Sequence, residues 1–286
     1  MIREKNPKMK TDTVLLILVL LLAVFGLIML FSISEYNGRV RFGDSAYYFK
    51  KQLFATALGL MAMYIVAEMD YRFFVGLAPA AYLLSMALST AVLLVGQEIN
   101  GSKRWLNFGP LSFQPSEFAK VAVILFLTWQ IEKSRKKTAG FWFMCRTMMT
   151  LLPIVGLVGT NNLSTAIIIL GIGVVLIFVS DPGYARFIGM GAAGVAVIAV
   201  FLAAESYRLE RLAIWRNPEK YEKGFQTIQG LYAIGSGGIF GRGFGSSLQK
   251  LGFVPEAQND MIFSIICEEQ GLAGASFLIL IFGLLL

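Results

Sequence analysis

Long apolar stretches separated by short polar segments recur along the whole chain. Most approach the roughly 20 residues that a helix needs to cross about 30 Å of hydrocarbon. The pattern therefore predicts an all-α, polytopic bundle of transmembrane helices. We expect eight spans: Thr13 to Ser34, Leu53 to Ala67, Phe73 to Val95, Phe118 to Ile131, Phe141 to Gly159, Ser164 to Val179, Phe187 to Ala204 and Met261 to Leu286.

The two ends of the chain qualify this picture. A basic cluster from Arg3 to Lys10 precedes the first span, as in a signal peptide, but the apolar part is too long and has no small-residue cleavage site. We interpret it as an uncleaved span. The last stretch is still apolar at Leu286, so we expect residues 1–286 to be a single membrane domain that lacks its C-terminal part.

Composition supports a membrane protein and narrows the chemistry. The chain is 56% hydrophobic, has no histidine, and contains two cysteines, Cys145 and Cys267. These counts exclude imidazole bases, histidine-based metal sites and a disulfide framework.

Basic residues give an uneven signal for orientation. A dense cluster at 133–137 lies in a short loop and favours a cytoplasmic N-terminus, because positive charge in short loops marks the inner side. The outer side then also becomes basic, above all in the long segment 205–260, which we expect to be a large extracytoplasmic loop. Such a surface suits an anionic ligand, for example a phosphate on a lipid. Alternatively, the charges are solvated or paired with nearby acids.

A glycine-dense segment from Gly235 to Gly245 leads to Val254 to Asp260, directly before the last span. Glycine allows backbone to approach another group closely or to adopt positive φ. Asp260 is placed either to cap the last helix or to act as a base on a sugar hydroxyl while cations hold a departing phosphate. Glu268 and Glu269, further along, either face a wet cavity in the membrane or precede the true hydrocarbon span; both alternatives predict a polar chamber there.

Two other polar segments interrupt the apolar pattern. From Asn100 to Lys120, a basic pair and a tryptophan lead through turn residues into a helix whose first turn suits Pro115. Glu117 and Lys120 share one face near the top of that helix, either as a functional pair or as a dipole-favoured acid with a snorkelling lysine. Residues 159–166 form a polar hairpin to which no chemistry can be assigned.

Several motifs together resemble the SEDS family (shape, elongation, division and sporulation proteins), in its FtsW/SpoVE branch more than its RodA branch. The motifs cover nearly the whole chain in matching order. The Pro-Glu-Ala version of the motif at 254–260 is the feature that resembles the FtsW/SpoVE branch. The motifs are Gly-Ser-Lys-Arg-Trp at 101–105, Gln-Pro-Ser-Glu-(x)2-Lys at 114–120, Tyr-Ala-Ile-Gly-Ser-Gly-Gly with later glycines at 232–245, and Val-Pro-Glu-Ala-Gln-Asn-Asp at 254–260 with Glu-Glu-x-Gly at 268–271.

The resemblance implies a fold of about ten membrane-crossing helices, of which eight are visible here, with a large outer loop between the seventh and eighth. It also implies polymerisation of lipid II into glycan strands at the outer face of the bacterial cell membrane, during division, elongation or sporulation. The acceptor's GlcNAc 4-hydroxyl attacks the donor's MurNAc anomeric carbon, with inversion and loss of undecaprenyl pyrophosphate. Asp260 corresponds to the family's essential aspartate and is the expected base.

The implied substrate-binding residues are Lys103, Arg104, Trp105, Gln114, Ser116, Glu117, Lys120, Arg242, Lys250 and Glu256. The expected partners are lipid II, a class B penicillin-binding transpeptidase and other division or sporulation membrane proteins, and no nucleic acid. No metal site is assigned, although a divalent cation, Mg²⁺ or Mn²⁺, is compatible with the chemistry. A lipid II flippase and a scaffold of the division complex are the alternatives.

The chain departs from the family's pattern at two places. Many members carry Pro-Asp-Leu-Gly-Thr where this chain has Asn161-Asn162-Leu163-Ser164-Thr165, so an acid common there is absent. Gln258-Asn259 replaces His-Thr before the aspartate.

Overall fold

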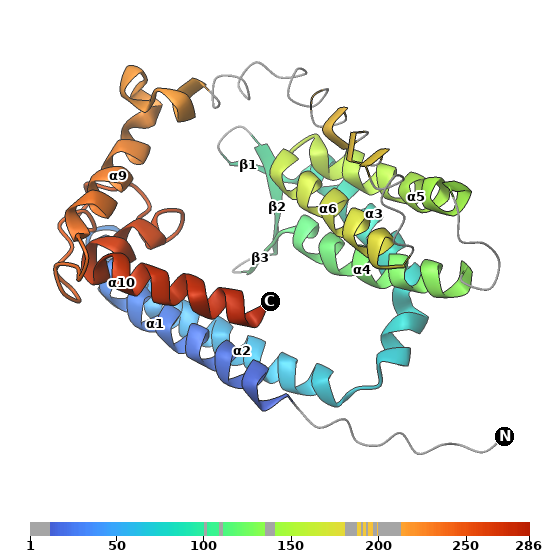
Figure 1. Ribbon diagram of the computed structural model, residues 1–286, viewed down its shortest axis with the longest axis horizontal. Coiled ribbons are helices and arrows are strands. Elements are labelled where there is room, and N and C mark those ends of the chain that lie inside the picture. Colours follow the sequence, from blue (N-terminus) through green and yellow to red (C-terminus); the bar gives the residue numbers. More distant parts are fainter. Residues whose placement is uncertain are drawn as a thin grey trace. The chain divides into compact units, whose positions relative to one another are not determined.

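The computed structural model describes residues 12–99, 102–108, 111–134, 141–180 and 213–286, with residues 188–189, 191–192, 194–196 and 199. Helices dominate these residues (Figure 1). The chain divides into two compact units, one made of residues 1–67 and 210–286 and the other of residues 68–209. Each unit is described by itself.

The first unit is built on two long helices, α1 (Thr13–Phe42) and α10 (Ile262–Leu285), which lie side by side (Figure 1). It also contains α2 (Tyr47–Glu68), the 3-10 turns η1 (Pro218–Lys220) and η2 (Glu222–Gly224), and α9 (Phe225–Gly237), which packs on α10. Its core joins α1, α9, α10 and the segment before α10 through Met29, Ile33, Ala233, Val254, Ala257, Ile265, Ile266 and Leu278.

Helix α1 is longer than the apolar pattern predicted. Asp12 caps its start, because the Oδ1 atom accepts a hydrogen bond from the amide of Leu15 at 3.1 Å. Gly43 ends it in the left-handed conformation, with φ 70°. Arg39 and Arg41, expected in a loop, therefore belong to the last turn, where basic side chains interact favourably with the helix dipole.

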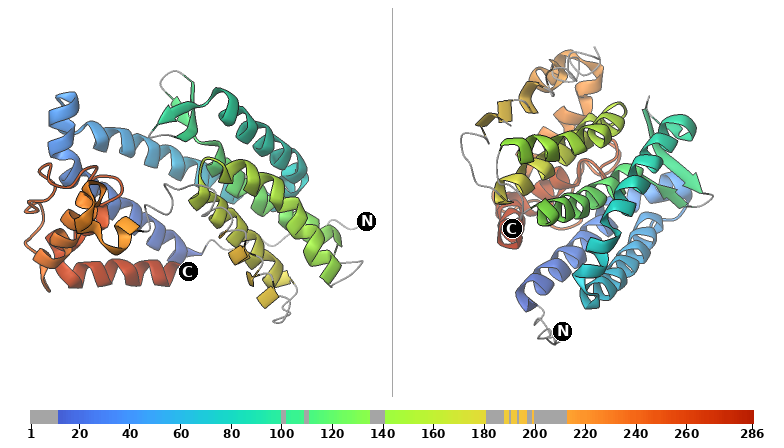
Figure 2. Two further views of the ribbon diagram at one scale, coloured as in Figure 1. Left: turned by 90° about the horizontal axis from the view of Figure 1, so that it is seen from above. Right: turned by 90° about the vertical axis from the view of Figure 1, so that its right-hand side faces the viewer.

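The second unit is a bundle of α3 (Tyr71–Val95), α4 (Pro115–Ser134), α5 (Phe141–Gly159) and α6 (Leu163–Ser180). A small antiparallel sheet joins α3 to α4; its strands are β1 (Gln97–Ile99), β2 (Ser102–Phe108) and β3 (Leu111–Phe113), in the order β1-β2-β3 (Figure 1). Figure 2 shows the strands as arrows from two further sides. The bundle core consists mainly of Val123, Leu127, Leu151, Ile154, Val155 and Ile169.

The expected spans correspond to described helices, apart from the one at 187–204, most of which lies outside the described residues. Five described helices are long and apolar enough to cross a membrane: α1, α3, α5, α6 and α10. α2 and α4 begin before the predicted starts because Tyr47 and Pro115 open their first turns. The sequence predicted neither the sheet nor α9, which lies within the expected loop 205–260.

Candidate active site

Helix α10 is interrupted at Gly271, whose φ of 68° and ψ of −168° are not helical. The glycine-dense segment packs against this break with backbone hydrogen bonds. A Cβ added at Gly241 would lie 2.2 Å from the Glu269 carbonyl oxygen, so only glycine fits there. The close approach predicted for these glycines is to α10 itself. Four bonds hold the segment: Arg242 N to Glu268 O (2.9 Å), Gly243 N to Glu269 O (2.9 Å), Leu272 N to Gly238 O (2.9 Å) and Ala273 N to Ile239 O (3.0 Å).

Glu268 and Glu269 are buried, each 1% exposed. Their partners come from the glycine-dense segment and the residues directly after it, and Ser32 of α1 also donates to Glu269 Oε1 at 3.4 Å. The Ser247 hydroxyl donates to Glu268 Oε2 at 2.5 Å, and the Leu248 amide donates to Glu268 Oε1 at 3.2 Å. Arg242 lies 3.6 Å from the same oxygen. Loop residues therefore enclose both carboxylates, and the polar chamber expected beside this helix stays a prediction.

Lys250 forms an internal ion pair. Its Nζ atom lies 2.8 Å from Glu269 Oε1 and donates to the Ser32 hydroxyl of α1 at 2.8 Å. The side chains of Lys250 and Glu269 are 9% and 0% exposed. The structure therefore gives this predicted substrate ligand a structural partner that the sequence did not indicate.

The segment from Val254 to Asp260 is attached to the C-terminal end of α1 through Glu256 and Gln258. Glu256 adopts a left-handed backbone conformation with φ 51°. Its Oε1 atom accepts from Arg41 at 2.6 Å, and Asn37 donates to Gln258 Oε1 at 2.7 Å. The Gln258 and Asn259 amides also donate to Glu256 Oε2, at 3.1 and 2.8 Å. Glu256, predicted to contact substrate, thus has several partners within the chain.

Asp260 is exposed and has no hydrogen-bond or ion-pair partner among the described residues. The capping role considered for it is wrong: α10 begins at Ile262, its cap is Met261, and no side chain caps it. A groove of about 430 Å³ runs beside this segment, lined by Gln258 and Asn259 together with residues of α1, α2 and α10. Its remaining lining residues are Leu22, Ala23, Gly26, Leu27, Leu30, Tyr48, Lys51, Gln52, Thr56 and Ile262.

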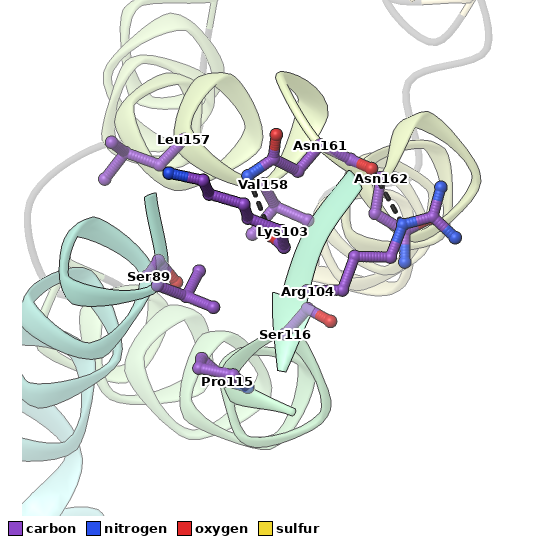
Figure 3. Close-up of a pocket in the computed structure, with 10 residues that line it drawn as sticks. Ser89, Lys103, Arg104, Pro115, Ser116, Leu157, Val158, Asn161 and Asn162 are labelled. Carbon is purple, nitrogen blue, oxygen red and sulfur yellow. Dashed lines mark hydrogen bonds between the residues drawn. The ribbon is translucent and has the colours of Figure 1, made fainter. Parts of the chain in front are cut away.

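In the second unit, the structure brings together the two polar segments that the sequence left unconnected. Strand β2 lies against the α5–α6 turn: Arg104 Nε donates to the Asn161 carbonyl at 2.9 Å, and Asn161 Nδ2 donates to the Lys103 carbonyl at 2.8 Å (Figure 3). A small cavity lies between these residues, lined by Lys103, Arg104 and Asn161 together with Ser116 in the first turn of α4.

The other predicted site residues of this unit are near the start of α4. Lys120 Nζ lies 2.7 Å from Glu117 Oε2, which confirms that these residues share one helical face. Trp105 is half-buried on β2, and Gln114 directly precedes α4 and accepts the Glu117 amide through its carbonyl. Asp260, Glu256, Lys250 and Arg242 belong to the first unit.

Apolar helices with charged segments at their ends define a multi-pass membrane protein. The chain belongs to the cell cycle protein family of FtsW, RodA and SpoVE, the SEDS family, whose model matches residues 12–286. This confirms the resemblance seen in its motifs.

Relatives and solved structures agree with this assignment. The chain is 34% identical to stage V sporulation protein E of Bacillus subtilis over 98% of its own length and 78% of that protein's. It is 31% identical to a probable peptidoglycan glycosyltransferase FtsW of Trichlorobacter lovleyi, covering 96% and 74% of the two chains. A chain of a peptidoglycan synthase complex matches with a TM-score of 0.74 at 30% identity, covering 97% and 76%. The rod shape determining protein RodA of Thermus thermophilus matches with a TM-score of 0.66 at 27% identity, covering 98% and 74%.

Proposed function

We propose that this protein is a peptidoglycan glycosyltransferase that polymerises lipid II, with Asp260 as the general base. The supporting observation is the exposed carboxylate of Asp260, which has no partner among the residues that the structure describes and ends a segment fastened to α1 and α10. Several relatives, including the one from Trichlorobacter lovleyi, are named probable peptidoglycan glycosyltransferases. Similarity to these relatives supports glycosyl transfer as the reaction, and the exposed carboxylate supports Asp260 as the base.

The reaction is a single displacement. Asp260 takes the proton from the acceptor's 4-hydroxyl while that oxygen bonds to the donor's anomeric carbon. The bond from this carbon to the diphosphate breaks, and its electron pair leaves with the undecaprenyl diphosphate. Basic side chains, such as the exposed Arg242, stabilise the charge on the leaving group. A Mg²⁺ or Mn²⁺ ion carried with the diphosphate would supply the same positive charge. Activity measured with and without a chelator distinguishes such an ion from the basic side chains as the source of that charge.

The expected sidedness places this chemistry outside the cytoplasm. With a cytoplasmic N-terminus, alternating spans put the end of α1 and the starts of α2 and α4 on the outer side. The span expected at 187–204 then brings the segment before α10 to that side as well. Lipid-linked sugars exposed at the outer leaflet would meet Asp260 there. We further propose that the protein works with a crosslinking class B penicillin-binding transpeptidase, because a similar chain is part of a peptidoglycan synthase complex.

The charges that suggested a lipid II transporter have partners within the chain. Glu117 pairs with Lys120, and Glu269 pairs with Lys250. These contacts give each charge a structural explanation, so we favour synthesis over transport.

The test is lipid II polymerisation by purified Asp260→Asn protein. General acid–base catalysis contributes about 10²–10⁴-fold, so we expect a loss of at least about 100-fold. Stability should stay within about 0.5 kcal/mol, because Asp260 is exposed and has no partner in the described part of the chain. Asp44→Asn is the matched control: Asp44 Oδ1 caps the Ala46 amide at 2.9 Å, which asparagine can also do, and polymerisation should continue. A normal rate in Asp260→Asn protein would rule out the proposed base.

A further inference from the structure

Two helices of the first unit show where an apolar layer ends. In α1, no charged residue occurs from Thr13 to Phe31, which is about 28 Å of helix and close to the roughly 30 Å of bilayer hydrocarbon. In α10, two acids and an amide come first, at 268–270, and no charged residue follows from Gly271 to Leu286. Each helix thus changes between apolar and polar at one definite position.

Contacts between the two helices place these positions at the same level. Gln270 Nε2 donates to Met29 Sδ at 3.2 Å, and the Ser32 hydroxyl donates to Glu269 Oε1 at 3.4 Å. The helices lie side by side (Figure 1), so the apolar part of α1 stops where the apolar part of α10 starts. We call this level the hydrocarbon boundary. Its polar side contains the start of α10 and the residues of α1 from Ser32 onward.

The glycine-dense segment turns at this boundary, over residues 238–244, and pairs there with the backbone of α10. In an unbroken helix the amides of Leu272 and Ala273 would pair with the carbonyls of Glu268 and Glu269. The break at Gly271 separates these groups, and the turn supplies a partner for each of the four at 2.9–3.0 Å. Unpaired backbone groups are very costly in hydrocarbon, so this pairing allows an irregular segment to lie at its edge.

The exposed side chains of this turn are large and apolar. The Ile239 carbonyl accepts the Ala273 amide, so Ile239 and Phe240 lie beside the apolar part of α10. Their side chains are 64% and 84% exposed. Phe244 is 56% exposed and lines a groove of about 300 Å³ together with Phe31, at the end of the apolar part of α1. Apolar side chains that gather in one exposed place mark an interaction surface.

We propose that residues 238–244 form a membrane anchor that inserts Ile239, Phe240 and Phe244 into the edge of the bilayer hydrocarbon. The partner is the acyl chains of the lipids, in the leaflet next to the C-terminal end of α1. Lipid is the occupant because these side chains lie at the level where two helices long enough to cross a membrane become apolar. The anchor rests on levels and exposure, and not on the proposed reaction.

The polar groups near the anchor fit this position. Arg242, the one charged residue of the turn, lies 3.6 Å from Glu268, which is on the polar side of the boundary. The start of α10 at Ile262 lies about 14 Å from the boundary on the same side, at about 1.5 Å per residue. The anchor would therefore fix the height above the hydrocarbon at which Asp260 is held.

Spin labels test the anchor in the full chain, in phosphatidylcholine nanodiscs and with both cysteines replaced (Cys145→Ser, Cys267→Ala). A nitroxide on Phe240→Cys reports collisions with oxygen, which concentrates in hydrocarbon, and with a water-soluble nickel chelate. We expect oxygen collisions to exceed nickel collisions several-fold, as at Val24→Cys, which is 54% exposed in the apolar part of α1. Val40→Cys is the matched control: Val40 is apolar and 65% exposed but lies on the polar side, so the ratio should reverse.

A second measurement does not depend on the labels. In lipids brominated near the headgroup end of their acyl chains, the emission added by Phe240→Trp should be quenched several-fold more than the emission added by Val40→Trp. Equal quenching of the two would overturn the proposal.

Two outcomes of the labelling would also overturn it. If the nitroxide at 240 meets the nickel chelate as readily as the one at 40, water covers the turn. If it is shielded from both oxygen and nickel, a protein surface such as a second copy of the chain covers the turn. Neither measurement needs catalysis, so both stay decisive for the anchor even if Asp260→Asn protein keeps its activity.

Discussion

The buried ion pair between Lys250 and Glu269 allows a quantitative test of how the segment before Asp260 is held. Lys250→Met keeps the length and apolar stem of the side chain but removes the ammonium group, which lies 2.8 Å from both Glu269 Oε1 and Ser32 Oγ. Glu269, with a fully buried side chain, then loses its cation. Removing one partner of a buried pair typically costs about 3–5 kcal/mol, because the remaining charge is uncompensated.

The appropriate assay is unfolding of purified protein in one detergent, followed by the loss of helical circular dichroism. We expect Lys250→Met to lower the free energy of unfolding by about 3 kcal/mol or more, which corresponds to a more than 100-fold change in the unfolding equilibrium. Lys51→Met is the control, since Lys51 is exposed in the same unit and should matter by less than about 0.5 kcal/mol.

A second substitution separates an unpaired charge from lost packing. In the double variant Lys250→Met/Glu269→Gln no charge remains at the pair, and the glutamine oxygen can still accept from Ser32. Most of the stability should therefore return, as replacing both partners of a buried pair is often nearly neutral. A Lys250→Met protein as stable as the Lys51→Met control, or a double variant less stable than Lys250→Met, would refute this reasoning.

Three further predictions concern the same unit. If the pair between Arg41 and Glu256 positions Asp260, Arg41→Met and Glu256→Gln should each slow polymerisation by lowering kcat more than they raise KM. The double variant should then be no slower than the slower of the two single variants. Independent effects of the two substitutions would show that this pair does not position Asp260. Gly271→Ala should destabilise the protein by about 1–3 kcal/mol or more, because the backbone conformation of Gly271 is strained for other residues and the added Cβ would lie 2.3 Å from the Gly241 amide nitrogen. Thermal unfolding measures this, and an unchanged midpoint would contradict it. The hydrogen bond from Lys50 lowers the pKa of Asp44, so Lys50→Met should raise that pKa toward its ordinary value in a carbon NMR titration. In the wild-type protein, the stability linked to Asp44 is present above the unfolded-state pKa of this group. It should be lost as pH falls through the lower, folded-state pKa.

The sequence predicted the helices well, because each apolar stretch must satisfy a length set by the membrane. It also predicted that Glu117 and Lys120 share a face, since a spacing of three follows from helical geometry. The ends of the helices were harder: α1 continues through Arg39 and Arg41 to Gly43, because polar residues can extend a helix beyond the hydrocarbon.

The contacts of the site could not be read from the sequence. Lys250 and Glu269 are 19 positions apart, while Arg41 and Glu256 are 215 apart. Such pairs depend on how distant segments pack, and no local pattern records that. The buried acids were interpreted as lining a chamber because a charge in a membrane span usually faces water or a partner. Here the partner is a loop whose glycines allow it to approach α10.

The central claim is that the exposed carboxylate of Asp260 removes a proton from the acceptor sugar. Its most direct test measures lipid II binding and single-turnover polymerisation on the same preparation of Asp260→Asn protein. We predict binding within about threefold of wild type, since asparagine keeps the shape of the side chain, and a rate of bond formation lower by at least about 100-fold. Unchanged bond formation with unchanged binding would contradict the claim.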